Sequence, residues 1–464
     1  DNLGWMYFKV HNTKKGIEIV NEGLKKYPES SDLLMTLGTL YSDIWDYENS
    51  KKYYLDSINY SYNDFKSNSF RAICYYNIAI LEHSFLFYEN AFNSSNASVS
   101  LKDRSSAHME LNYLYQSRLE LKKAYEECIK ASGLEPKTLF PEMSIANINI
   151  YAGNVDKGIN LILDLLRTKD FSWMLYFGTN KDAFYSELYK NLAFGYLCKS
   201  NSLEFMKKHD FFNLFIIPFE RIYYYLLSVF YNFRFANLNI KIGEELIKGG
   251  SELEGLHQLY DGYKSVFSPQ AYKLLLITEK IETKLNSRKQ KIFNIEKPTM
   301  KNKVDLFYSN KQKKNDLLKA INLLDNQWEK ALKVDALYEV YSASSGDEKS
   351  RYRDELFSLF PPILPMSHIS MGFKIVLTNS GLNSNSQKKL LKALRNRGII
   401  NDKKSSYTLD IKTENDSIYV NLYDKKNIIN SYNIKQKSKN KNDFEELTIE
   451  IFKKIFTIEL SRIE

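Results

Sequence analysis

Small and large residues recur along this chain at a spacing of 34 residues. The first matches are Leu3 with Leu37, Gly4 with Gly38, Tyr7 with Tyr41 and Gly16 with Ser50. Two antiparallel helices fit into such a unit, and they need a small residue where their backbones cross and a large one where a side chain fills a groove. The spacing therefore predicts a stack of helical hairpins.

Further copies of the pattern follow along the chain. The small residues at the crossing positions are Ala79 and Ala91 in the third copy, Ala124 and Ala131 in the fourth, and Ala146 and Gly158 in the fifth. Asn112 replaces the small residue at one crossing position of the fourth copy. A sixth copy starts at Leu192-Ala193 and a seventh at Leu227-Ser228, and the second helices of these two are degenerate.

This pattern resembles the tetratricopeptide repeat (TPR), with Leu at position 7, Gly or Ala at 8, Tyr at 11, Ala at 20 and 27, and Pro near 32. The resemblance implies a mostly α chain whose residues 1–285 form a TPR-type α-α superhelix of about six or seven hairpins, clearest over residues 1–166. Because the chain opens inside a repeat, we expect a further segment before residue 1.

A basic stretch follows the repeats. Ten basic and two acidic residues lie between Lys284 and Lys314, against a net charge of +9 for the whole chain. We expect residues 286–315 to be a solvated linker, with an acidic partner as the alternative. No nucleic-acid motif accompanies the charge, so no nucleic-acid partner is expected.

Two helices and a boundary come next. Residues 316–343 carry apolar residues at helical spacing after Asp316, and residues 347–360 read as a shorter helix, so residues 316–360 are expected to form a helical pair. The run PPILP from Pro361 to Pro365 stops helix formation and predicts a domain boundary.

The last part of the chain, residues 366–464, alternates apolar and polar residues. Strands are expected in 369–379, 406–414, 417–425 and 428–438, a helix in 384–398, and a closing helix after Phe444. Asn415-Asp416 predicts a hairpin turn. The order β-α-β-β-β-α predicts a small C-terminal α+β domain.

No reaction centre is visible in the sequence. The six histidines are scattered, and no phosphate-binding loop or nucleophile motif occurs. The three cysteines, Cys74, Cys128 and Cys198, are expected to be free buried thiols, and the adjacent acids Glu126 and Glu127 to lie on a solvated helix face. We therefore expect no cofactor, no metal ion, no catalytic residue and no enzymatic activity.

A TPR array forms a groove, which is lined by positions 2, 5, 9, 12 and 13 of each first helix. The predicted partner-binding residues of this groove are Met35, Thr39, Tyr76, Ile80, Met109, Tyr113, Met143 and Asn147. Met and Tyr give wide apolar contacts, which suit a hydrophobic segment or helix of a protein partner. The alternative is that later helices of this chain fill the groove.

These features predict a non-catalytic scaffold that assembles a protein complex. The residue usage, with 34 Tyr and 28 Phe, and the TPRs beside a C-terminal module resemble spirochaete TPR proteins of the periplasmic flagellar collar. The resemblance implies a periplasmic protein with collar or stator partners, and a cytoplasmic one is the alternative. No apolar run of membrane-spanning length occurs in the sequence.

Two other functions stay open. The C-terminal part is loosely similar to small domains of envelope lipoproteins, which implies a factor that regulates a cell-wall or outer-membrane enzyme, with the repeats as a spacer. The other open function is catalysis by a domain within residues 366–464.

Overall fold

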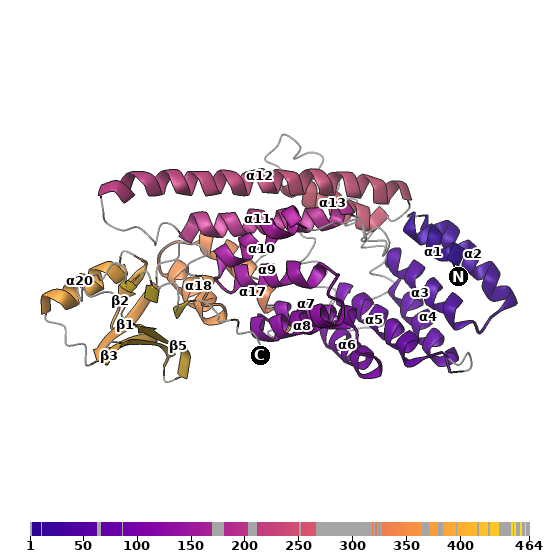
Figure 1. Ribbon diagram of the computed structural model, residues 1–464, viewed down its shortest axis with the longest axis horizontal. Coiled ribbons are helices and arrows are strands. Elements are labelled where there is room, and N and C mark those ends of the chain that lie inside the picture. The colour runs from indigo at the N-terminus through magenta and orange to yellow at the C-terminus, as the bar shows by residue number, and fades with distance from the viewer. Residues whose placement is uncertain are drawn as a thin grey trace.

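The computed structural model describes residues 2–10, 12–62, 66–85, 87–168, 181–202, 211–249, 252–265, 327–363, 371–378, 384–395, 397–414, 417–425 and 427–435, with single residues between 318 and 324 and between 447 and 460. Helical hairpins fill the first half and a mixed α+β region the second, as predicted. Figure 1 shows α1 and α2 at one end of the molecule and the sheet with α20 at the other.

Ten helices form the first five hairpins, and each helix contacts the next along the chain. Their bounds are α1 (Asn2–Lys9), α2 (Thr13–Lys26), α3 (Ser31–Asp43), α4 (Tyr47–Tyr60), α5 (Asn68–Ser84), α6 (Tyr88–Leu101), α7 (Ser105–Ser117), α8 (Leu121–Leu134), α9 (Phe140–Tyr151) and α10 (Val155–Thr168). The first helices also contact one another in the order α1, α3, α5, α7, α9. This is the predicted TPR-like stack.

The small residues of the repeat lie where two helices of one hairpin cross. A Cβ atom added to Gly38 would stand 2.7 Å from a ring carbon of Tyr54. One added to Gly158 would stand 2.6 Å from the carbonyl oxygen of Ala146. Because real Cβ atoms do not approach so closely, the spacing of small residues sets the distance between the helices.

Serine at repeat position 27 replaces the usual alanine in two hairpins. Ser57 Oγ donates to the carbonyl of Ser31 at 2.7 Å, and Ser98 Oγ donates to the carbonyl of Ala72 at the same distance. In both cases the acceptor is the first residue of the same repeat. The buried hydroxyl is therefore satisfied, and it joins the end of the second helix to the start of the first.

The last described helices of the array are α11 (Lys181–Ser202), α12 (Phe211–Gly249) and α13 (Glu252–Ser265). The predicted seventh repeat at Leu227-Ser228 is wrong, because α12 continues to Gly249 with no turn where that repeat would need one. The 24 residues after Pro218 contain neither Gly nor Pro, so nothing in them stops the helix. Helix α12 packs on both α11 and α13 and serves two hairpins (Figure 1).

Three glycines place the true last hairpin between α12 and α13. Added Cβ atoms on Gly243 and Gly255 would each stand 2.7 Å from the other residue's carbonyl oxygen, and one on Gly262 would stand 2.9 Å from that of Ala236. The intervals of 12 and 7 residues equal those between Gly38, Ser50 and Ser57. The repeat register therefore resumes 15 residues later than predicted.

The helical pair that follows is shorter than predicted. Helix α17 (Lys330–Ser342) starts well after Asp316, and the described residues between 322 and 329 form turns and bends. Trp328 lies in these turns and is buried against the repeats. This packing is made from a turn, where the prediction expected a continuous helix. Helix α18 (Gly346–Leu359) agrees with the prediction and ends before Pro361.

A five-stranded mixed sheet forms the rest of the described chain. Its strand order is β2-β1-β3-β4-β5, with β1 parallel to β2 and β3 and the remaining pairs antiparallel. The bounds are β1 (Met371–Thr378), α20 (Ser384–Arg395), β2 (Ile399–Asn401), β3 (Tyr407–Glu414), β4 (Ser417–Asp424) and β5 (Asn427–Lys435). The short strand β2 adds to the predicted order. Residues 447, 448, 450, 451 and 455 are helical, within the predicted closing helix.

One hydrophobic core continues from the repeats into the sheet. Phe357 of α18 packs on Phe373 and Tyr407 of the sheet, with ring centroids 5.5 and 4.8 Å apart, and on Phe456 at 6.0 Å. The same cluster of buried residues reaches back to α8 and α9. The domain boundaries stay a prediction, and the basic stretch 286–315 lies outside the described residues.

Candidate protein-interaction surface

The inner face of the array is built by the first helices of successive repeats. Helices α3, α5, α7 and α9 contact one another in sequence, so residues at the same repeat position form rows across them. The eight predicted partner-binding residues all lie on these four helices. Their exposure differs, because some rows face outward and others lie between neighbouring helices.

Ile80 and Tyr113 are the predicted residues most open to solvent. They are 36% and 38% exposed and come from α5 and α7 at the same repeat position. Tyr76 of α5 is half-buried near Tyr113. Burial raises the pKa of both tyrosines, and the negative charge of Glu110 adds to this. Both hydroxyls therefore stay protonated at neutral pH and keep their ability to donate a hydrogen bond.

A histidine–glutamate pair lies beside these rings. His83 Nδ1 and Glu110 Oε1 are 2.6 Å apart, with Glu110 buried and His83 partly exposed. The His83 ring also contacts Tyr88, with centroids 5.5 Å apart. The inner face of α5 and α7 thus combines apolar rings with one buried carboxylate.

The two predicted methionines of the later repeats are not open to a partner. Met109 and Met143 are 7% and 8% exposed and belong to the hydrophobic core. Phe140, which neighbours Met143 on α9, packs edge-on against Phe184 of α11 at 5.5 Å. Position 5 in these repeats is therefore closed by the contact between first helices.

The remaining predicted residues take part in local hydrogen bonds. Thr39 is half-buried, accepts a hydrogen bond from Tyr54 Oη at 3.0 Å and donates to the carbonyl of Met35, which is also half-buried. Asn147 donates to Gln116 Oε1 at 3.4 Å. The partner-binding role of all eight residues stays a prediction.

An amide network fills the space next to Asn147. Asn112, at a crossing position where a small residue was expected, donates to Ser144 Oγ at 2.8 Å. Gln116 donates to both Asn112 and Ser144, at 2.9 and 3.0 Å. The larger Asn112 is thus accommodated because its amide group donates a hydrogen bond to Ser144 of the next repeat. The network holds α7 against α9.

Part of the array is covered by a later segment of the chain. Trp328 packs on Tyr88 and Phe92, with ring centroids 6.4 and 5.4 Å away, and the Arg118 guanidinium lies 4.7 Å above its ring. Leu114, beside Tyr113 in the sequence, is buried in this cluster. The later segment therefore covers the Leu114 side of α7 and leaves Tyr113 exposed.

The structure also places a buried charge cluster that the sequence did not indicate. His108 Nδ1 lies 2.5 Å from Glu127 Oε2 and its Nε2 2.6 Å from Asp103 Oδ1, while Lys130 pairs with Glu127 at 2.8 Å. Glu127 is buried, so the expectation that it lies on a solvated face is wrong. Its side chain points from α8 toward α7, and only the fold brings His108 there.

Burial and pairing act in opposite directions on this cluster. Burial lowers the pKa of His108, but its hydrogen bonds to Glu127 and Asp103 outweigh burial and raise it. Burial raises the pKa of Glu127, but the bonds from His108 and Lys130 outweigh it and lower that pKa. With an acceptor at each ring nitrogen, the charged imidazolium fits this position.

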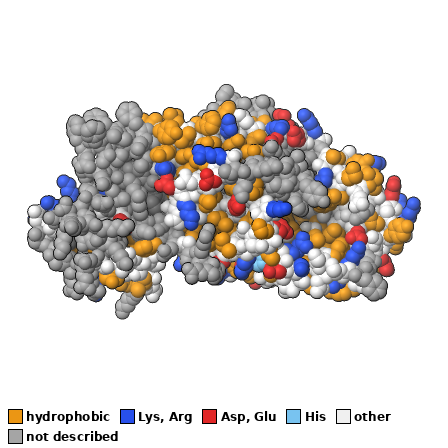
Figure 2. All heavy atoms as spheres, viewed as in Figure 1, with side chains coloured by type: hydrophobic (Ala, Val, Ile, Leu, Met, Phe, Trp, Pro, Cys, Tyr) orange, Lys and Arg blue, Asp and Glu red, His pale blue; other side chains and the backbone are white. Residues whose placement is uncertain are grey.

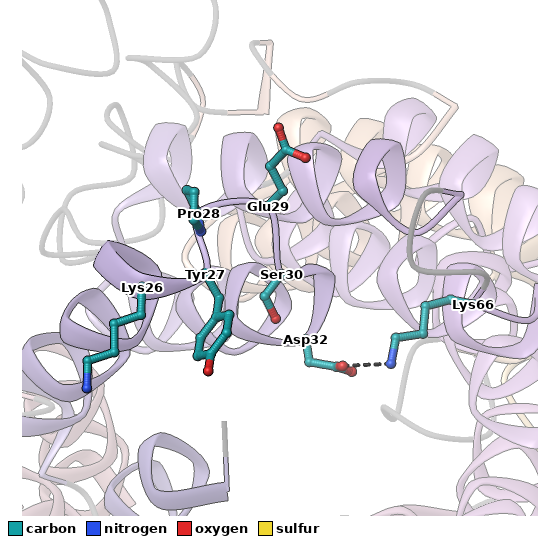
Figure 3. Close-up of a pocket in the computed structure, with 7 residues that line it drawn as sticks. All are labelled: Lys26, Tyr27, Pro28, Glu29, Ser30, Asp32 and Lys66. Carbon is teal, nitrogen blue, oxygen red and sulfur yellow. Dashed lines mark ion pairs between the residues drawn. The ribbon is translucent and has the colours of Figure 1, made fainter.

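An open pocket of about 620 Å³ lies at the turn between α2 and α3. Asp32 and Lys66 form an ion pair across it at 2.6 Å. Figure 3 shows Lys26 and Glu29 pointing away from this pair, with Tyr27 turned to another side. These side chains do not converge on one point, so the pocket has no geometry for holding a small ligand.

The described part of the chain has few side chains suited to metal binding or catalysis. It contains no group of three side chains placed to bind a metal ion. The three cysteines are free and buried, as predicted. Burial raises the pKa of Cys74 to about 11 and of Cys128 to about 12, so neither thiol is a nucleophile at neutral pH. Within the same ranges, no helix is both long and apolar enough to span a bilayer.

Comparisons with known proteins place the chain only broadly. No protein-family model and no curated protein matches it. The solved structure of Naa15/Naa10 bound to HypK-THB is similar at a TM-score of 0.27 and 14% identity, over 85% of this chain and 62% of that one. Yeast Tom70 is similar at a TM-score of 0.20 and 15% identity, over 63% and 70%. The description of this chain as a TPR-like helical-hairpin array therefore rests on its own repeat spacing and packing.

Proposed function

We propose that this chain is a non-catalytic scaffold that binds a protein partner through the inner face of α5 and α7. The observation that carries the proposal is the exposure of Ile80 and Tyr113 in a row whose other members, Thr39 and Asn147, are half-buried. Large apolar side chains at a concave, repeat-built face are typical of peptide and helix recognition. Tyrosine gives wide contact area and loses little entropy when it is ordered.

The partner that suits this face is an apolar segment, such as one side of an amphipathic helix. The rings of Tyr76 and Tyr113 and the side chain of Ile80 form its apolar floor. Burial raises the pKa of both tyrosine hydroxyls, so the face offers the segment mainly the apolar surface of the rings. The Trp328 cluster limits the face on the Leu114 side.

The assembly that we propose for this scaffold is the periplasmic flagellar collar and its contacts with the stator. The support is the residue usage, rich in Tyr and Phe, together with helical repeats that precede an α+β module. A scaffold of this kind holds several proteins in one complex without doing chemistry.

A second candidate function concerns the C-terminal sheet. Strand β5 is the last in the strand order, and Ile428 and Ile429 on it are exposed, Ile428 by 61%. An edge strand with exposed β-branched residues is suited to pairing with another protein. This supports a factor whose C-terminal region regulates an envelope enzyme.

Photo-crosslinking in the producing cells tests both functions. A photoreactive phenylalanine analogue at position 80 or 113 is expected to capture one defined protein, and the same analogue at Leu134, 41% exposed on α8, is expected to capture none of it. Capture from position 428 alone would overturn the inner-face proposal and support the second function. If the analogue captured the same protein equally from positions 113 and 134, the proposed site would be wrong, because binding would not be specific to the inner face.

Once the partner is known, substitutions measure the contribution of the rings. The double variant Tyr76→Ala and Tyr113→Ala should weaken binding by tenfold or more, since central tyrosines are typical hot spots. Leu134→Ala should leave the affinity unchanged. Circular dichroism and melting should stay near those of the unmodified chain, because Tyr113 keeps much of its surface in water. Loss of folding in the double variant would show that these rings are core residues.

A further inference from the structure

Helix α12 exposes a stripe of large apolar side chains along much of its length. The stripe consists of Ile222, Tyr223, Leu226, Val229, Phe230 and Phe233, which are between 38% and 58% exposed. Figure 2 shows hydrophobic side chains gathered along the edge of the molecule that α12 forms in Figure 1. Soluble proteins seldom leave such a patch open unless it binds something.

The stripe does not belong to the packing of α12 within the chain. The opposite side of the helix contacts α11, where Tyr224 and Tyr231 stack on Tyr196 with ring centroids 6.0 and 5.7 Å away. Ser228 and Phe235 are buried on that side too. Helix α12 thus has two apolar sides, and the hairpins use one of them.

The spacing of the exposed side is that of a coiled-coil seam. Tyr223, Leu226, Phe230 and Phe233 follow one another at intervals of 3, 4 and 3 residues, the a and d positions of a heptad. In the sequence, Phe212, Ile216 and Phe219 precede them in the same register, and Asn237 follows. A seam of this kind is complementary to another helix with the same seam.

We propose that two copies of this chain associate through antiparallel pairing of their α12 helices. In that pairing Tyr223 lies level with Phe233 of the second copy, and Leu226 with its Phe230. The register favours this direction: Ile222 and Val229 occupy g positions, and g positions face each other only in an antiparallel pair. The exposed apolar side chains at these positions then extend the seam on both sides of the two-fold axis.

A parallel pair lacks this complementarity. It would bring each e position beside a g position, and the g positions of the stripe are Ile222 and Val229. Arg234, at an e position, is exposed; its guanidinium donates to Tyr189 Oη at 3.2 Å and lies 4.9 Å from the Phe230 ring centroid at the border of the seam. A parallel pair would therefore place this charge beside the apolar Val229 of the second copy.

The area of the stripe fits a dimer. Six side chains of this size, half exposed, present about 100 Å² each, so each copy contributes about 600 Å². Two such surfaces reach about 1,200 Å², the lower bound for specific interfaces, before the preceding turns of α12 are included. Interfaces of this size start at micromolar affinity, so dimerisation should be visible at tens of micromolar.

The mass of the full chain in solution tests the proposal. Analytical ultracentrifugation up to about 100 μM should show twice the chain mass of 54.4 kDa. Phe230→Asp should give a monomer with unchanged helix content, because it places a charge in the seam. Leu134→Asp, an equally drastic change at an exposed leucine of α8, should remain a dimer.

Two further variants test the direction of pairing. Val229 lies opposite Val229 of the second copy only in the antiparallel register, so Val229→Cys should form an interchain disulfide under mild oxidation. Tyr223→Cys should not, since its two copies would stand about 15 Å apart along the helix, beyond disulfide reach. The native cysteines are buried and do not interfere.

A wild-type chain that stays monomeric at about 100 μM overturns the proposal, including when it binds vesicles of anionic phospholipid. A dimer that Phe230→Asp leaves intact overturns it equally. None of these outcomes depends on the inner face of α5 and α7.

Discussion

His108 is held by carboxylates on both of its ring nitrogens, and this makes the contact between α7 and α8 dependent on pH. The raised pKa of His108 means that its contribution to stability is complete below its ordinary value of 6.5 and is lost as pH rises through the raised value. The lowered pKa of Glu127 means that its contribution is present above 4.5 and is lost as pH falls through the lowered value. The cluster is therefore most stabilising between pH 5 and 6.

Replacing His108 should remove this dependence. His108→Gln should lower the free energy of unfolding by about 1.5–3 kcal/mol near pH 5.5, the range for hydrogen bonds to charged groups, and by less at pH 9. Urea unfolding at a series of pH values measures it. Lys15→Gln, which removes the exposed ion pair with Glu18, should leave the stability nearly unchanged at each pH. An equal loss at pH 5.5 and 9 would contradict the charged state of His108.

Single residues show what the sequence can and cannot predict. Ile80 and Tyr113 were expected at an open face and are exposed, whereas Thr39 and Asn147 at the same repeat position are half-buried. Met109 and Met143 share position 5, and the tight contacts between first helices bury them. That closure depends on the curvature of the stack, which no local pattern encodes. Glu127 is a further case, since its partner His108 lies on another helix.

At the scale of helices, the sequence predicted the first five hairpins because small residues mark each crossing. The prediction failed at α12 for two reasons. The small residues at the helix crossing, Gly243, Gly255 and Gly262, lie in a new register, and no helix-breaking residue separates the two hairpins that share α12. A search for glycines at intervals of 12 and 7 would have found that hairpin. The shared helix has a consequence for function: its free side becomes the stripe from Ile222 to Phe233.

Glycine substitutions test whether backbone contact holds α12 and α13 together. A Cβ on Gly255 would stand 2.7 Å from the Gly243 carbonyl oxygen and 2.6 Å from Ile247, so Gly255→Ala should cost about 1–3 kcal/mol despite the better helix propensity of alanine. Gly133 on α8 has nothing within 4 Å, and Gly133→Ala should stabilise the chain by about 0.5–1 kcal/mol. Thermal melting, measured by the loss of helix content, compares the stabilities of the two variants. Stabilisation by both would show that α13 does not lie as described.

At the scale of the whole molecule, the two halves of the chain are joined by packing as well as by sequence. The core that starts in α8 and α9 continues through α17 and α18 to the sheet, and Trp328 adds a second contact at α6 and α7. The sequence did not predict this, because residues 328 and 114 lie far apart in the chain. The arrangement leaves both Tyr113 and the α12 stripe exposed, so the proposed partner site and the proposed dimer contact do not exclude each other.

Trp328 is the residue whose loss should separate the later segment from the repeats. Its ring is buried between Tyr88, Phe92 and Arg118, so Trp328→Ala should cost about 3–5 kcal/mol of the packing in this region. Hydrogen exchange should therefore speed up in the peptides of α6, α7 and α17 and stay unchanged in α4, which contributes no residue to this cluster. Trp5→Ala, at an exposed tryptophan of α1, should leave exchange in all four helices unaltered. Unchanged protection of α6 and α7 in Trp328→Ala would show that the two halves are not coupled here, and partner binding at Tyr113 would then be independent of the C-terminal region.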